Sequence, residues 1–403
     1  MSVILDAIKF NHNTASHHTD ALTIRRNRYD DINVPEWQNG ISVRPEDSPA
    51  AYSILQTRGH RITIEAKFHT TGPVLSTARI RAIDPAILRG WLGWIVRIIY
   101  FFRRFIYGNV LGEIKVKGVT FNITGHTGFV TFELIRPKIA RAGTGVYNIK
   151  WQWQYRKSGS GRWHNMQLSK HRIYVIPETP KEAWNQIPGS DHLPWTEVLD
   201  YSCAWARGAK TRDEAATKIT EHVYALGNSV IEYDCPGGGS THYCYSSVFD
   251  CTKFIERMKG GTGNGQYVNC TDIATVVTTF SNILGCELWN SKMSGPLGFL
   301  LNPILAIGSS AWQTACGWGA FSYHEVAWKN NCDVNDELFD ACLQVDGDSD
   351  PTAAPHTGLL PTNIKFGDCS GPLLYRLRLS PPVAGGCTDC IPDPGSKRRR
   401  TVK

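Results

Sequence analysis

The chain has 403 residues, of which 42% are hydrophobic and 20% are charged. This balance excludes both a disordered chain, which would be richer in charge, and a membrane protein, which would be more apolar. The formal net charge of +7 is small for this length, and a basic run at 397–400 carries part of it, so nucleic acid is not an expected partner.

The length exceeds what one hydrophobic core usually serves, so two domains are expected. All twelve cysteines lie between Cys203 and Cys390, and this asymmetry indicates a boundary ahead of the cysteine-rich half. The sequence therefore predicts a first domain at 1–176, a proline-rich linker at 177–195, a cysteine domain at 196–380, and a tail with cysteines and basic residues at 381–403.

Residues 1–18 lack the basic start and long apolar core of a secretory signal, which predicts synthesis in the cytoplasm and leaves non-classical export open. The even number of cysteines would also suit disulfides in an oxidising place. His12, His17 and His18 cluster in the chain but are interpreted as exposed polar residues rather than metal ligands.

Apolar and polar residues alternate in several segments of the first half, as they do in half-buried antiparallel strands. The clearest segment is 146–157, and the residues expected to share one face are Tyr147, Ile149, Trp151, Trp153 and Tyr155. Similar segments lie at 62–68, 128–135 and 171–177, separated by turn residues. Several short strands of this kind favour an immunoglobulin-like β-sandwich.

Residues 86–108 interrupt the strands with an aromatic segment that contains four arginines: Arg89, Arg97, Arg103 and Arg104. These charges leave no uncharged run near the roughly 18 residues that a membrane span requires. The segment is predicted to be a helix inserted between strands. It either packs on the protein or lies on a membrane surface with its arginines at the headgroups.

Beyond the linker the hydrophobic period lengthens to that of a helix. Thr211 and Glu214 have the spacing of a capping box, which predicts a helix from there to about Leu226. The second domain is therefore expected to mix helices and strands.

Cys270 follows a glycine-rich loop and precedes a helical stretch whose apolar residues are Ala274, Val277, Phe280 and Leu284. At a helix N-terminus, the helix dipole and unpaired backbone amides favour a thiolate and can also stabilise an oxyanion. His324, in the strand pattern 321–328, is the candidate base. Asp340, on the next strand pattern, is the candidate residue that orients the imidazole, with Asp333 and Asp336 as alternatives.

This arrangement resembles the transglutaminase-like superfamily of papain-like cysteine enzymes over about residues 200–345. Its motif is a Cys-x-Asp-x-Ala helix start, then a strand led by histidine, then a strand bearing aspartate. Cys270-Thr-Asp-Ile-Ala274 matches the helix start, and residues 281–288 are similar to the helix end of the superfamily.

The resemblance implies that Cys270 is the nucleophile, His324 the base and Asp340 the orienting residue. It also implies a nucleophile helix packed against an antiparallel sheet. Val268 and Val326 stand where the superfamily usually has a glycine and an aromatic residue, so its oxyanion groups are not transferred to this chain.

Other motifs compete with this interpretation. The Asp-Cys-Ser-Gly sequence at Cys369 resembles the start of cell-wall endopeptidases, but their histidine lies downstream and no histidine follows Cys369 here. Cys387 and Cys390 form a CxxC without a second ligand pair, which favours a disulfide or free thiols in a mobile tail. The aspartates at 346–350 are interpreted as an acidic surface turn rather than a calcium loop.

The predicted protein is multidomain, β plus α+β, with an N-terminal immunoglobulin-like β-sandwich and a C-terminal papain/transglutaminase-like α+β domain. Its leading function is acyl transfer through a Cys270 thioester, on a protein or peptide substrate and without cofactor or metal. Hydrolysis, deamidation and transamidation share that intermediate and stay open. The alternative is a non-catalytic binding or effector protein that uses the sandwich and residues 86–108. The sequence predicts no oligomeric state.

Overall fold

The computed structural model describes residues 2–12, 20–72, 75–85, 109–157, 159–227, 229–313, 315–384 and 386–403. The chain divides into two compact units. Unit 1 comprises residues 1–179 and 186–188, and unit 2 comprises residues 180–185 and 189–403. The predicted helix at 86–108, His17 and His18 lie outside the described residues.

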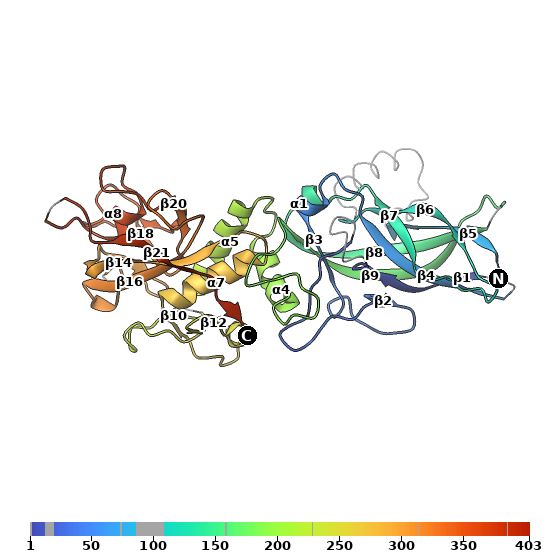
Figure 1. Ribbon diagram of the computed structural model, residues 1–403, viewed down its shortest axis with the longest axis horizontal. Coiled ribbons are helices and arrows are strands. Elements are labelled where there is room, and N and C mark those ends of the chain that lie inside the picture. Colours follow the sequence, from blue (N-terminus) through green and yellow to red (C-terminus); the bar gives the residue numbers. More distant parts are fainter. Residues whose placement is uncertain are drawn as a thin grey trace. The chain divides into compact units, whose positions relative to one another are not determined.

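Unit 1 is built on a nine-stranded sheet in the order β2-β1-β4-β7-β6-β5-β8-β9-β3 (Figure 1). Neighbouring strands are antiparallel except β3 and β9, which are parallel. The strands are β1 (Ser2–Lys9), β2 (Trp37–Gln38), β3 (Ala50–Ser53), β4 (Thr63–Thr71), β5 (Thr77–Ile83), β6 (Glu113–Thr120), β7 (Val130–Ile135), β8 (Gly145–Lys157) and β9 (His164–Ile176). Two single-turn helices accompany them, α1 (Ile54–Thr57) and α3 (Ile139–Ala142).

The core of unit 1 is apolar and aromatic. In β8, Trp151 and Trp153 are fully buried while Asn148 and Lys150 face solvent, which confirms the expected alternation over most of 146–157. Gln154 is the exception, because it is only 5% exposed and follows an irregularity in the pairing of β8 with β9. Phe68 packs its ring edge to face against Trp153, with 5.6 Å between ring centroids. Large aromatic side chains of this kind bury the most apolar area per residue and so dominate the stability of a core.

The strands of unit 1 join in a single curled sheet. An immunoglobulin-like sandwich has two sheets that pack face to face without sharing a strand. Here β7 pairs with β4 on one side and with β6 on the other, and this double pairing links what would have been separate sheets. The β-rich character is confirmed, and the separation into two sheets is not seen in the described strands.

Unit 2 combines helices with several small sheets, of which the largest has the order β20-β17-β16-β14-β21. Its helices are α4 (Thr196–Trp205), α5 (Arg212–Tyr224), α6 (Cys251–Met258), α7 (Cys270–Asn282), α8 (Tyr375–Leu379) and the 3₁₀ helix η2 (Ala315–Gly317). Its strands are β10 (Glu232–Tyr233), β11 (Cys244–Tyr245), β12 (Val248–Phe249), β13 (Tyr267–Val268), β14 (Trp289–Leu300), β15 (Leu305–Ala306), β16 (Ala320–Trp328), β17 (Glu337–Phe339), β18 (Leu343–Asp346), β19 (Gly358–Leu359), β20 (Thr362–Lys365), β21 (Ile391–Arg398) and β22 (Thr401–Val402).

Helix α7 is the central element of unit 2, and all of its residues are buried. It packs against β16 of the five-stranded sheet and against α5 and α4 (Figure 1). Helix α5 begins where the sequence predicts, because the Thr211 hydroxyl accepts a hydrogen bond from the backbone nitrogen of Glu214 at 3.2 Å. The mixed α+β character of this half is confirmed.

The proline-rich segment predicted to be a linker packs largely on unit 2. The backbone nitrogen of Lys181 donates to the Asn282 carbonyl at 2.8 Å, and the Trp184 indole donates to the Thr279 carbonyl at 2.9 Å, both at the end of α7. Trp184 also packs against Trp195, and both rings are buried. Regular structure lapses here, but the backbone is held by tertiary contacts.

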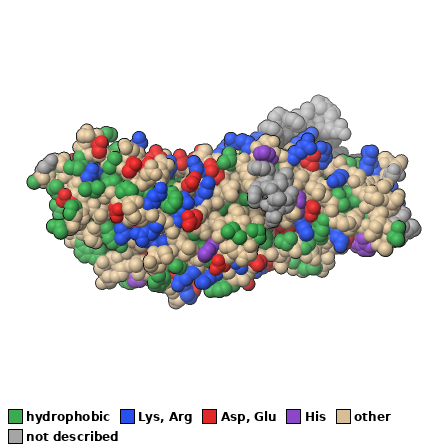
Figure 2. Space-filling model, viewed as in Figure 1, with side chains coloured by type: hydrophobic (Ala, Val, Ile, Leu, Met, Phe, Trp, Pro, Cys, Tyr) green, Lys and Arg blue, Asp and Glu red, His purple; other side chains and the backbone are tan. Residues whose placement is uncertain are grey.

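The C-terminal residues are part of the fold of unit 2 instead of a solvated tail. Strand β21 pairs antiparallel with β14, and β22 pairs parallel with β12. The basic run therefore packs on the unit: the Arg399 guanidinium lies 3.6 Å from the Trp289 ring centroid, and Arg400 is buried at 4% exposed, while residues 397–399 are partly exposed. On the face in Figure 2, basic and acidic side chains are interspersed, with neither sign covering it continuously.

Two disulfides join Cys235 to Cys316 and Cys369 to Cys387. The second disulfide corrects the expectation for the CxxC, because Cys387 pairs with Cys369 instead of with Cys390, which is a buried free cysteine. It also leaves Cys369 without a free thiol, so the rival motif at Cys369 has no nucleophile. Within the described part of the chain, no helix has the length and apolar character to cross a membrane.

Two polar predictions need correction at single residues. In the acidic turn at 346–350, Asp350 is exposed as expected, but Asp346 is buried and its carboxylate is hydrogen-bonded to His356 Nδ1 at 2.6 Å. The His12 side chain is only 6% exposed and its Nε2 lies 3.1 Å from the Thr63 hydroxyl. Both side chains form hydrogen bonds with residues of other segments, and such pairings cannot be predicted from the local sequence.

Candidate functional site

Cys270 is the first residue of α7 and is 5% exposed. The helix begins there because Asn269 caps it. The Asn269 side chain accepts a hydrogen bond from the backbone nitrogen of Asp272 at 3.1 Å, and the Asp272 carboxylate accepts one in return from the Asn269 backbone at 3.3 Å. This reciprocal capping box fixes the helix start and places the Cys270 side chain at its positive end.

Asp272 also holds the loop that precedes β11. Its carboxylate accepts a hydrogen bond from the Thr241 hydroxyl at 2.7 Å and from the backbone nitrogens of residues 242–244 at 2.8–3.0 Å. A buried carboxylate with this many donors is well compensated for its loss of water. The aspartate of the Cys-x-Asp motif therefore attaches a separate loop to the start of the Cys270 helix.

His324 lies in β16, the strand that packs against α7, and its side chain is fully buried. Its Nε2 is 2.9 Å from Asp340 Oδ2. An ionised carboxylate can only accept, so Nε2 carries a hydrogen and a neutral ring keeps its lone pair on Nδ1. Nδ1 has no hydrogen-bond partner within the described residues.

Two side chains, Asp340 and Cys270, raise the pKa of His324. Burial by itself lowers the pKa of His324, but the charge and hydrogen bond of Asp340, together with the nearby Cys270 side chain, raise it to about 10. With this pKa the ring is protonated at neutral pH. An imidazolium beside a cysteine at a helix N-terminus favours the thiolate, the nucleophilic form of the residue.

Asp340 is held from several directions, so its orientation is defined. Oδ1 accepts hydrogen bonds from the backbone nitrogens of Cys342 and Leu343 at 2.8 and 3.2 Å. Oδ2 accepts one from the Tyr375 hydroxyl at 2.8 Å in addition to that from His324. The Tyr375 ring is fully buried at the start of α8, a segment that gave no functional signal in the sequence.

The alternative orienting residues lie elsewhere. The Asp336 carboxylate accepts hydrogen bonds from the Asn330 side chain and from the backbone of Asn331 and Asp333, at 3.0, 2.9 and 3.2 Å. Asp333 Oδ1 accepts from a backbone nitrogen two residues on. Both carboxylates stabilise the loop between β16 and β17, and Asp340 is the one that reaches His324.

Unit 2 also contains a cavity of about 290 Å³. Tyr233 lines this cavity, and burial and then the charge of Cys270 raise the pKa of Tyr233. The remaining lining residues are Glu232, Cys235, Pro236, Tyr267, Ile304, Ala306, Ile307, Gly308, Ser309, Ala311, Gln313 and Cys316. The cavity therefore has both polar and apolar lining residues, and the Cys235–Cys316 disulfide borders it. One lining residue, Ile307, is hydrogen-bonded through its backbone nitrogen to the carbonyl of Cys342 at 2.8 Å, two residues beyond Asp340.

The described residues contain no cluster of three or more histidine, cysteine or acidic side chains that could hold a metal ion.

Two charged residues near the site were not singled out from the sequence. Glu325 follows His324 and is 1% exposed, and Arg400 forms a buried ion pair with it at 2.7 Å. Glu325 could have been found from the sequence, because it is a charged residue directly after the candidate base. Nothing local indicates that Arg400, in the final basic run, would be buried against it.

No family model matches the sequence, and no curated protein does. Among solved structures, the chain is similar to the crystal structure of red sea bream transglutaminase, with 12% identity and a TM-score of 0.36. The match covers 76% of this chain and 51% of that chain, so this chain spans about half the length of the transglutaminase. A similarity of this size assigns no function, which has to be inferred from the geometry around Cys270.

Proposed function

We propose that this protein catalyses acyl transfer through a thioester on Cys270, with His324 as acid and base and Asp340 as the residue that orients it. The observation that carries the proposal is the arrangement of His324: its Nε2 is bound to Asp340, and its unpartnered Nδ1 belongs to a ring whose pKa responds to Cys270. Nucleophile, base and orienting group in this relation are the components of thiol acyl transfer.

In the first half-reaction, the Cys270 thiolate attacks the carbonyl carbon of an amide and a C–S bond forms. The C–N bond then breaks, and His324 Nδ1 gives its proton to the leaving amine. In the second half, water or another amine attacks the thioester while Nδ1 takes its proton. The C–S bond breaks and the thiolate returns. Hydrolysis and transamidation differ here only in the second nucleophile.

The substrate class follows from the same chemistry. A thiolate that forms a thioester acts on carbonyl compounds with a leaving group, and amides of proteins or peptides are the substrates we propose. The Cys-x-Asp-x-Ala start of α7 supports a transglutaminase-like assignment for this unit, because the motif's aspartate organises the helix start around the nucleophile.

Thiol reactivity tests the proposal without knowledge of the substrate. Each cysteine is labelled with iodoacetamide from about pH 5 to about pH 9 and its rate is read by peptide mass spectrometry, since only the thiolate reacts. Cys270 is expected to react fastest at the acidic end, and His324→Gln should remove that advantage. Cys286 is the internal control, because at 6% exposed it is as inaccessible as Cys270 at 5%.

His356→Gln is the matched control variant, since His356 is also paired with a buried aspartate but lies outside the site. It should leave Cys270 labelling unchanged. If Cys270 reacts like Cys286 in the native protein, the thioester mechanism is wrong and the unit is a structural one whose function is binding.

A further inference from the structure

The residues that follow the candidate nucleophile and the candidate base are joined to each other. Thr271, next to Cys270, donates from its hydroxyl to Glu325 Oε2 at 2.9 Å, and Glu325 is next to His324. Thr271 is 6% and Glu325 1% exposed. Helix α7 and strand β16 are thus linked by a buried side-chain hydrogen bond one residue beyond the reacting pair.

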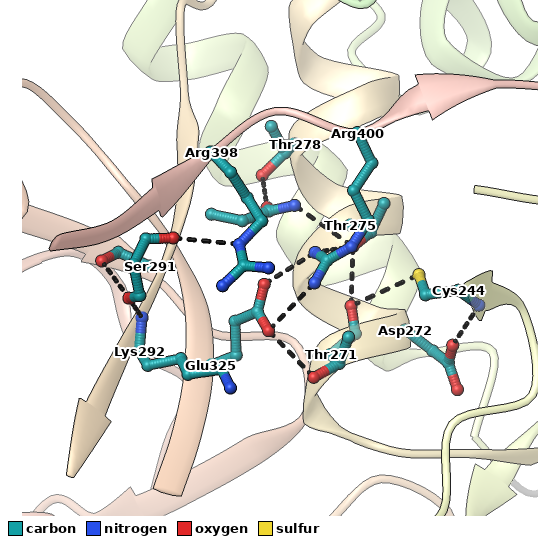
Figure 3. Close-up of polar contacts among 12 residues, drawn as sticks. Cys244, Thr271, Asp272, Thr275, Thr278, Ser291, Lys292, Glu325, Arg398 and Arg400 are labelled. Carbon is teal, nitrogen blue, oxygen red and sulfur yellow. Dashed lines mark hydrogen bonds and ion pairs between the residues drawn. The ribbon is translucent and has the colours of Figure 1, made fainter. Parts of the chain in front are cut away.

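Arg400 holds this link from the C-terminal segment. Its Nη1 donates to Glu325 Oε1 at 2.7 Å, and its Nη2 donates to Oε2 at 3.3 Å. Nη1 also donates to the Thr275 hydroxyl at 2.8 Å. Thr275 is one helical turn beyond Thr271, so both lie on the same side of α7. Figure 3 shows Arg400 between the helix and Glu325, with Thr271 reaching the same carboxylate.

The guanidinium therefore touches both elements that carry the reacting groups. It binds the helix through Thr275 and the strand through Glu325, and Glu325 in turn binds the helix through Thr271. The backbone that delivers Arg400 is itself fixed, because β21 pairs with β14 and β22 pairs with β12 on either side of it. A planar, rigid donor fork suits this task better than the single ammonium of lysine.

We propose that Arg400 is a positioning residue for the Cys270–His324 pair, acting through the Glu325–Thr271 hydrogen bond. This inference rests on the function proposed above. It assigns a role to the terminal basic run, whose last arginine sets the distance between the helix start and the strand that bears the base. Small displacements at such a site cost reactivity, because proton transfer and attack both depend on sub-ångström geometry.

A buried ion pair can also serve stability alone, and loss of one partner destabilises a fold because the other charge stays buried. A purely structural pair would change the melting temperature and leave the reactivity of the folded protein intact. A positioning pair would change the rate and the pH profile of Cys270 labelling in protein that is still folded. The two roles therefore differ in a measurable quantity.

The most conservative variant is Thr271→Val, which keeps the shape of the side chain and removes the hydroxyl that donates to Glu325. We expect Cys270 labelling at about pH 6 to slow roughly tenfold, the scale of one hydrogen bond to a charged group. Thr220→Val is the control, because Thr220 is a fully buried threonine of α5 whose hydroxyl donates to the Ala216 carbonyl at 2.8 Å, away from this network.

Arg400→Met removes the fork and should slow Cys270 labelling at least as much, and Arg400→Lys should restore only part of the rate. Arg398→Met, on the adjoining strand, removes an arginine whose Nε donates to the Ser396 carbonyl at 3.0 Å and should leave the rate unchanged. If Arg400→Met lowers the folded fraction, Glu325→Met with Arg400→Met removes both buried charges together and restores folding without restoring the Thr271 link.

The outcomes separate the two proposals. Fast labelling of native Cys270 that slows in folded Thr271→Val and in the double variant, while Cys286 is unaffected, supports the positioning role. Fast native labelling that is unchanged in both overturns it and leaves the thioester mechanism standing. Native Cys270 that labels no faster than Cys286 refutes the thioester mechanism, and the positioning role with it.

Discussion

Both units bury a histidine completely, and the two rings are affected in opposite directions. In unit 1, burial lowers the pKa of His171 to about 3; the ring packs against Phe10 and Trp151, and its Nε2 lies 2.8 Å from the Ser169 hydroxyl. In unit 2, burial also lowers the pKa of His324, but the charge and hydrogen bond of Asp340 and the nearby Cys270 side chain together outweigh burial and raise this pKa to about 10. The difference lies in the partner, because a hydroxyl cannot compensate a buried charge as a carboxylate can.

The contrast extends to the cores around these rings. Unit 1 is stabilised by apolar alternation along its strands and contains a cluster of aromatic rings. Unit 2 buries ionisable groups in pairs, among them His324 with Asp340 and Glu325 with Arg400. Paired buried charges cost desolvation and are weak evidence for stability. Such groups cluster at functional sites, and the Asp346–His356 pair, which lies outside the candidate site, is the internal comparison for the other two.

The largest expected effect is that of Asp340→Asn on acyl transfer. The asparagine oxygen would keep the backbone donors of Cys342 and Leu343, and its amide group would then face His324 Nε2. A donor at that place favours the neutral tautomer with its proton on Nδ1, which cannot accept the proton of a nucleophile. We expect the rate to fall by roughly 10²–10⁴, the contribution of general acid–base catalysis.

The control for this variant is Asp346→Asn, which alters a second buried aspartate–histidine pair that has no place in the mechanism. It should leave the rate within about twofold of the native protein. Equal losses of rate in both variants would show that Asp340→Asn acts through folding. The buried pairs of unit 2 would then have no special role in catalysis.

The next effect concerns stability in unit 1. Trp153 is fully buried and its indole donates to the Ser169 hydroxyl at 3.0 Å. Trp153→Ala should lower the free energy of unfolding of this unit by about 3–5 kcal/mol. Hydrogen exchange over residues 145–176 would report it, while Cys270 labelling should stay fast. If Cys270 labelling slowed in Trp153→Ala protein that is still folded, the core of unit 1 would affect the reactivity of Cys270, which contradicts this prediction.

The smallest effect is a pH dependence that distinguishes the histidines. A histidine whose folded pKa is lowered to about 3 costs stability as pH falls below its unfolded pKa of 6.5, because the unfolded chain gains a proton first. At pH 5 this amounts to about 2 kcal/mol. His324, with its pKa raised to about 10, contributes stability that is complete below 6.5 and is lost as pH rises towards 10.

Urea titrations of native protein, His171→Phe and His324→Gln would separate the two contributions. The first variant should flatten the acid side of the stability profile for unit 1, and the second should flatten the alkaline side for unit 2. A shared dependence in both units would mean that neither histidine accounts for it.

The elements that sequence predicts best here are those set by local chemistry. Thr211 and Glu214 fix a helix start within a few residues, and the alternation at 146–157 gives the buried face of β8. His324 lies in β16 and Asp340 directly follows β17, the neighbouring strand, instead of lying on it, and the hydrogen bond between the two side chains is present.

The features that sequence did not predict depend on pairings between distant segments. The curling of unit 1 into one sheet is decided by β7, which joins β4 to β6. The burial of Arg400 is decided by Glu325, which lies far from it in the chain and carries no pattern that points to the C-terminal segment. A basic run has the same composition whether it is solvated or paired.

The central claim is that Cys270 forms a thioester with the help of His324, and a short exposure to p-nitrophenyl acetate tests it most directly. The protein is quenched in acid and its peptides are analysed for acetyl groups that hydroxylamine removes, as it does from thioesters. The account predicts such an acetyl group on Cys270, absent in His324→Gln and in Cys270→Ala. Acetylation spread over lysines and other cysteines, with none on Cys270 that depends on His324, would contradict it.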